Sequence, residues 1–75
     1  MTIKEIKSRK ENNDASNGNT YLIRLKNTRD DLCDWYPDEL CFVREVFENC
    51  VVIFRAFDGK EYKLTENEVK NFKLI

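Results

Sequence analysis

The 75-residue chain contains no histidine, two glycines and no long apolar run, and each shortage excludes a class of function. Without histidine, proton transfer near neutral pH requires a carboxylate, thiol or amine whose pKa is strongly shifted by burial, and so small a domain seldom encloses such a pocket. The two glycines lie far apart, so no phosphate-binding loop of the Gly-x-x-x-x-Gly-Lys type exists. We therefore expect a protein that is not an enzyme, binds a partner and needs no cofactor.

Apolar residues are never continuous for long enough to cross a membrane. The longest run covers residues 50–54, whereas a membrane-spanning helix needs about 20 apolar residues. The first residues carry charges every few positions and contain no apolar segment like that of a secretory signal. A cytoplasmic location without membrane contact is the expectation.

The three cysteines do not predict a metal site. Cys33, Cys41 and Cys50 have no Cys-x-x-Cys spacing, and no histidine is present to complete a zinc site. Reduced, partly buried thiols are expected. A disulfide between Cys41 and Cys50 across a hairpin is the alternative.

Charge is nearly balanced overall but unevenly distributed. The net charge is −1 and the pI is about 5.4, whereas domains that depend on phosphate contacts usually have a basic excess. Residues 1–10 are basic, and residues 30–48 contain seven acidic residues beside the single Arg44. The balance disfavours nucleic acid as the partner.

The first strand is predicted where apolar and basic residues alternate after Thr20. This period-two pattern is typical of a half-buried strand. The apolar face consists of Tyr21, Ile23 and Leu25, and the opposite face of Arg24 and Lys26, with Leu22 as an exception.

Two more strands are predicted over residues 39–47 and 50–57, where β-branched and aromatic residues dominate. The two residues between them, Glu48 and Asn49, are expected to form a tight connection with Asn49 at positive φ. Residues 51–54 are all apolar, which indicates a central strand covered on both faces or containing a bulge.

Phe42 and Phe47 have opposite parity on the predicted strand 39–47, so a regular strand cannot place them on one face. A core position for both, made possible by a bulge, is the expectation. If one is exposed, it adds an apolar patch for a partner or a dimer.

The last third of the chain carries the strongest turn signals. Asp58-Gly59 predicts a type I′ turn, in which both central residues have positive φ, leading into a strand over residues 60–64. Thr65-Glu-Asn-Glu is a capping box that predicts one helical turn. Residues 72–74 predict a fifth strand.

The amino-terminal segment is predicted as a flexible or marginally helical arm over residues 1–19. Thr2 and Glu5 resemble a capping box, Ile3 and Ile6 share a helix face, and residues 11–19 are rich in turn formers. The remaining residues 20–75 predict a mostly β domain, a five-stranded SH3-like small barrel with one or two short helical turns, the first near Thr28.

Residues 52–64, followed by the turn that starts at Thr65, resemble the third and fourth strands and final turn of Tudor-like domains. The resemblance implies an aromatic cage that holds a methylated lysine or arginine by attraction to ring faces and to an acid. Trp35, Tyr36 and Phe57 with Asp58 would supply such groups. Residues 47–53 are also similar to the second-to-third strand turn of Sm-like RNA-binding proteins, but residues 65–68 are acidic where that family has a basic motif.

The first hypothesis for function is a protein-interaction module that docks an acidic and aromatic surface on a basic protein partner, because aromatic residues supply buried area and acids steer a basic surface. An inhibitor or adaptor, as small acidic phage or mobile-element proteins can be, is one form of it. The expected binding residues are Asp30, Asp31, Asp34, Trp35, Tyr36, Asp38 and Phe57. A structural role for Trp35 as a plug of the barrel is the alternative.

The second hypothesis is a nucleic-acid-binding barrel that contacts phosphates through its basic arm and first strand. Its affinity should fall steeply as the salt concentration rises. The residues expected to bind are Lys4, Lys7, Arg9, Lys10, Arg24 and Lys26.

Overall fold

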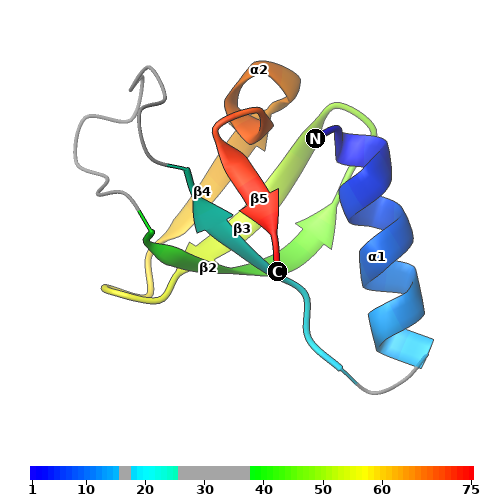
Figure 1. The fold of residues 1–75 in the computed structure, drawn as a ribbon, viewed down its shortest axis with the longest axis horizontal. Helices are drawn as coiled ribbons and strands as arrows, with labels where there is room; N and C mark the ends of the chain where they lie inside the picture. The colour runs from blue at the N-terminus through cyan, green and yellow to red at the C-terminus, as the bar shows by residue number, and fades with distance from the viewer. Residues whose placement is uncertain (16–17, 26–37) are drawn as a thin grey trace.

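The computed structural model describes residues 1–15, 18–25 and 38–75 and shows a single antiparallel sheet with two helices (Figure 1). The strands are connected in the order β4-β3-β2-β1-β5, so β4 and β5 are the two edges of an open sheet. The mostly β class and the five strands are thus confirmed. The elements, in chain order, are α1 (Ile3–Ala15), β1 (Tyr21–Arg24), β2 (Leu40–Val46), β3 (Cys50–Arg55), β4 (Glu61–Thr65), α2 (Glu66–Val69) and β5 (Phe72–Leu74).

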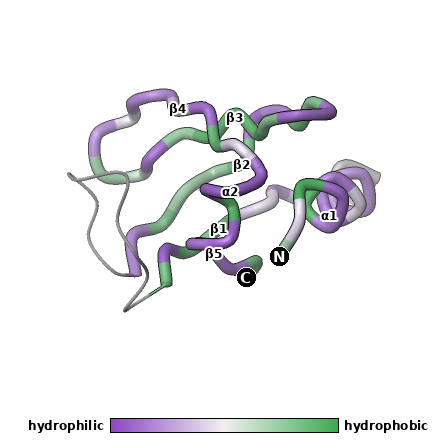
Figure 2. The backbone as a smooth tube through the Cα atoms, turned by 90° about the horizontal axis from the view of Figure 1, so that it is seen from above, coloured by the Kyte–Doolittle hydropathy of each residue, from purple (hydrophilic) through white to green (hydrophobic). Residues whose placement is uncertain are grey.

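The hydrophobic core lies on one face of the sheet, where α1 and α2 pack against it. In Figure 2 the central strands β2 and β3 carry long green, apolar segments, whereas β4 and α1 are mostly purple, hydrophilic. No helix in the described ranges has the length and apolar character needed to span a membrane. The buried core residues are Ile3, Ile6, Leu22, Cys41, Val43, Val51, Ile53, Leu64, Val69 and Phe72.

The predicted orientation of β1 is wrong. Leu22 is fully buried and Arg24 is 2% exposed, whereas Tyr21 is 37% exposed, so the face expected in solvent is the core face. Leu22 is in register with Cys41 on β2, and Arg24 is in register with Phe72 on β5. The prediction assumed that the arginine needs water, but its guanidinium lies 5.7 Å from the centre of the Phe72 ring, an arrangement that favours a cation.

The predicted bulge is present, and it lies in β2. The register between β2 and β3 shifts between Val43 and Glu45, so Arg44 is the extra residue. The prediction that Phe42 and Phe47 both enter the core is wrong: Phe42 is half-buried outside the core, and Phe47 is 47% exposed. The shift occurs between the two phenylalanines, but Phe47 falls beyond the end of the strand.

The two hairpin turns differ in backbone conformation from the prediction. Glu48 and Asn49 do form a two-residue connection, which the Phe47 N–H closes on the Cys50 carbonyl at 2.8 Å. In the described part of the chain, Asp38 is the non-glycine residue with positive φ (64°), so positive φ at Asn49 and the type I′ turn at Asp58 are wrong. Residues 56–59 instead form a longer loop with Gly59 at φ 69°.

Helix α1 is longer than the short helix that the sequence predicts. The Thr2 hydroxyl accepts from the Glu5 N–H at 3.2 Å, as a cap does. Ile3 and Ile6 enter the core, and residues 11–15, which belong to the segment rich in turn formers, continue the helix. Adding residues to a helix costs less free energy than forming its first turn, and here the first turn is already fixed by Ile3 and Ile6 in the core. At the far end, the Asn13 amide donates to the Thr20 hydroxyl at 2.9 Å.

The predicted capping box after β4 is confirmed. The Thr65 side chain accepts from the Glu68 N–H, and the Glu68 carboxylate accepts from the Thr65 N–H at 3.0 Å. The single turn α2 brings Val69 into the core and directs the chain into β5. β5 pairs with β1, as the antiparallel register of Leu74 with Leu22 shows.

Candidate partner-binding surface

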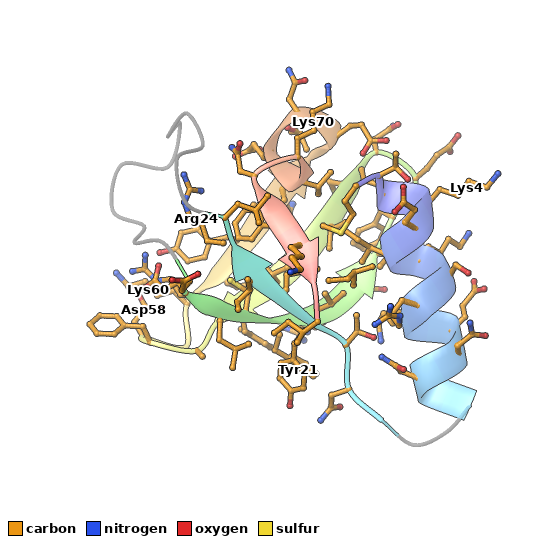
Figure 3. The ribbon with its side chains drawn as sticks, in the orientation of Figure 1. Lys4, Tyr21, Arg24, Asp58, Lys60 and Lys70 are labelled. Carbon is orange, nitrogen blue, oxygen red and sulfur yellow. The ribbon has the colours of Figure 1, made fainter. Side chains whose placement is uncertain are left out.

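Two of the seven residues predicted to bind a protein partner belong to the described part of the chain. Asp30, Asp31, Asp34, Trp35 and Tyr36 lie outside the described residues, as does Lys26 of the nucleic-acid hypothesis. The other two, Asp38 and Phe57, lie on neighbouring segments at one end of the sheet, because the Ala56 N–H donates to the Leu40 carbonyl at 3.0 Å. Figure 3 shows this end, marked by Asp58 and Lys60, on the opposite side of the molecule from Lys4.

Phe57 lies in the loop that joins β3 to β4. It is 79% exposed, more than any other large apolar residue in the described part of the chain. The loop is closed by the Arg55 N–H on the Lys60 carbonyl at 2.9 Å and by the Gly59 N–H on the Arg55 carbonyl at 2.7 Å. Gly59 accepts its positive φ at no steric cost. The phenyl ring therefore projects from a loop with a defined backbone.

The side chain of the buried Arg55 holds this loop in place through hydrogen bonds to Asp58. Arg55 is 6% exposed, and its Nε donates to Oδ2 of Asp58 at 3.2 Å, while a terminal nitrogen donates to the same oxygen. A carboxylate oxygen of Glu39 lies 3.9 Å from Nε. The guanidinium carbon lies 5.3 Å from the centre of the Tyr62 ring and 5.8 Å from that of Phe57. Two carboxylates and two rings thus surround one internal cation.

The charges in this cluster stabilise one another. The hydrogen bond from Arg55, supported by the Lys60 N–H that donates to Oδ1 at 3.0 Å, holds the pKa of Asp58 below its ordinary value of 3.8. The same side-chain hydrogen bond raises the pKa of Arg55 above its ordinary value. Both groups are therefore charged at neutral pH.

The Phe57 and Asp58 groups that a Tudor-like cage would use are engaged by Arg55 of the chain itself. Trp35 and Tyr36, the other two rings that the resemblance assigns to the cage, lie outside the described residues.

One sequence signal would have indicated the cluster around Arg55. Arg55 is an alternate residue of the same strand as the buried Val51 and Ile53, so its side chain points to the core face. A charged residue at a core parity needs partners, and an acid follows three positions later.

We define the aromatic row as Tyr21, Phe42 and Phe54, which lie side by side on β1, β2 and β3. The ring centres of Tyr21 and Phe42 are 5.8 Å apart and edge-to-face, and those of Phe42 and Phe54 are 6.4 Å apart and stacked. The Arg44 guanidinium carbon lies 5.2 Å from the centre of Phe54, and Arg44 pairs with Glu61 at 2.9 Å. Sequence reasoning missed this row because it placed Tyr21 in the core.

Among the described residues, the cations predicted to contact nucleic acid do not form one basic surface. Lys4 and Lys7 are exposed on α1, but the groove of about 450 Å³ beside them also contains Glu48 and Glu66. The exposed Arg9 donates to the Ile75 carbonyl at 2.9 Å. Lys10 is half-buried, and a smaller groove beside it contains Glu11 and Glu45, while Arg24 is buried.

The described cysteines are free thiols, so the alternative of a Cys41–Cys50 disulfide is wrong. Cys41 is buried, and desolvation raises its pKa to about 12, while Cys50 is partly exposed. Within residues 1–15, 18–25 and 38–75, no cluster of three metal-ligating side chains occurs.

Comparison of the chain with family models, with curated proteins and with solved structures gives no match.

Proposed function

We propose that this protein is a non-catalytic protein-interaction module that docks the hairpin-end surface on a basic surface of another protein. The hairpin-end surface consists of Phe57 and Asp58 on the β3–β4 loop and Asp38 and Glu39 before β2. The observation that carries the proposal is the 79% exposure of Phe57 on a loop held by a buried arginine.

An exposed aromatic residue on a fixed loop is suited to be a binding anchor. Interfaces depend on a few large side chains that enter pockets on the partner, and aromatic residues are prominent among them. Because the Arg55 and Lys60 hydrogen bonds already fix the loop, binding would lose little conformational entropy.

Acidic residues in the described surface and in the preceding sequence favour a basic partner. Asp38 is exposed beside the loop, and residues 30–39 contain five acids in sequence. Such charges raise the rate of association with a surface rich in lysine and arginine and orient the encounter. An inhibitor that covers a nucleic-acid site on its target, or an adaptor, would both use a surface of this chemistry.

The experiment is affinity capture from the native source with three immobilised proteins: the wild type, Phe57→Ala and Phe47→Ala. Phe47 is the matched control because it is also an exposed phenylalanine, but it lies at the β2–β3 hairpin and not in the β3–β4 loop. The proposal expects a protein that the wild type and Phe47→Ala retain and Phe57→Ala loses. A set of retained proteins that is the same for all three variants would contradict the proposal.

Nucleic-acid binding has less support from the geometry. Arg24 is buried, and the grooves beside Lys4, Lys7 and Lys10 contain glutamates whose negative charge repels a phosphate.

We further propose that the sheet is that of an SH3-like small barrel. The support is a meander of four strands, a capped turn and a fifth strand that pairs with β1.

A further inference from the structure

The aromatic row lies on the face of the sheet opposite the core. Residues in register on neighbouring antiparallel strands share a face, and Tyr21, Phe42 and Phe54 alternate with the core residues Leu22, Val43 and Ile53. In the described part of the chain, no helix lies across this face (Figure 1).

Apolar side chains extend the row along the strands. Leu40 is 39% exposed, and Ile23, which is in register with it on β1, is half-buried. A contiguous group of aromatic and aliphatic side chains on a sheet face that neither described helix covers is typical of a protein interface.

The two ends of the row differ in chemistry and complement each other. One end is Tyr21, which offers a ring face and a hydroxyl. The other end is Phe54 covered by the Arg44 guanidinium, with Glu61 beside it. A cation is attracted to a tyrosine ring, and a carboxylate accepts from a phenol hydroxyl. Each end therefore carries groups that suit the opposite end of an identical row.

We propose that the occupant of this face is a second copy of the chain. A two-fold axis that runs along β2, between two stacked sheets, places β1 of one copy over β3 of the other. Tyr21 of each copy then meets the Arg44–Glu61 pair of the other, and the two Phe42 rings meet near the axis. The same operation places β5, with Lys73, over β4, with Glu61.

The experiment measures the mass of the full chain in solution by sedimentation velocity over a concentration series. The proposal expects a reversible species of twice 9.0 kDa. Phe42→Ser should weaken the dimer at least about tenfold, whereas Phe47→Ser, an exposed ring outside the row, should leave it unchanged. Circular dichroism shows whether each variant is folded.

A charge exchange tests the geometry even if Phe42→Ser fails to fold. Tyr21→Arg alone should weaken the dimer, because it opposes Arg44 across the interface, and adding Arg44→Glu should restore it. A wild type that stays monomeric, a dimer that folded Phe42→Ser retains, or a double variant weaker than Tyr21→Arg would each overturn the proposal. Phe57→Ala should leave the dimer intact, so this result is independent of the hairpin-end surface.

Discussion

Arg55 and Asp58 form a two-point contact in which Nε and a terminal nitrogen of the buried guanidinium donate to one carboxylate oxygen. The contact joins the last residue of β3 to the loop that carries Phe57. It links stability to the proposed function, because the same pair that satisfies a buried charge also fixes the exposed ring.

The depressed pKa of Asp58 predicts a loss of stability in acid. A carboxyl whose pKa is lower in the folded than in the unfolded state stabilises the fold above its ordinary pKa of 3.8, and this contribution is lost as the pH falls through the lower folded value. Urea unfolding of the wild type and of Asp58→Asn should give free energies that differ at neutral pH and converge in acid. A constant difference across that range would contradict the assigned cause.

The orientation of β1 predicts that alanine substitutions at the neighbouring residues Leu22 and Ile23 lower the free energy of unfolding by different amounts. Leu22→Ala removes a fully buried side chain and should lower the free energy of unfolding by about 2 to 4 kcal/mol. Ile23→Ala, on the other face, should cost less than about 1.5 kcal/mol, because Ile23 is only half-buried. Chemical denaturation checks both, and a larger loss for Ile23→Ala would restore the orientation expected from sequence.

The different burial of the two described cysteines predicts different reactivity. Thiolates react with iodoacetamide, and Cys41 is buried with a pKa of about 12, whereas Cys50 is partly exposed. Brief alkylation of the native protein followed by peptide mass spectrometry should label Cys50 and spare Cys41 until denaturant is added. Equal labelling of the two in the native state would show that the core opens on that timescale.

The sequence was sufficient for features that depend on local chemistry. The capping box of Thr65 and Glu68 and the two-residue connection at Glu48 and Asn49 are contacts between close neighbours, so the residue types predict them. The choice between the two faces of β1 depends on the register with β2 and β5, which the pattern of Tyr21 and Leu22 does not encode.

The sequence around Arg55 indicates that it needs an acidic partner, but neither the remaining partners of Arg55 nor the aromatic row can be predicted from one strand pattern. Glu39, Arg55 and Tyr62 come from three separate segments, and only the pairing of the strands brings them together. The row likewise requires the registers of β1 with β2 and of β2 with β3. A single strand pattern predicts which residues share a face, but it does not identify their neighbours across the sheet.

The measurement that tests the central claim most directly is the affinity of the captured partner for purified Phe57→Ala and Phe47→Ala, by calorimetry at constant salt. The account predicts that Phe57→Ala weakens binding at least about tenfold, or 1.4 kcal/mol, while both variants remain folded and Phe47→Ala binds like the wild type. Equal affinity of Phe57→Ala and the wild type would contradict the assignment of the hairpin-end surface as the site of docking.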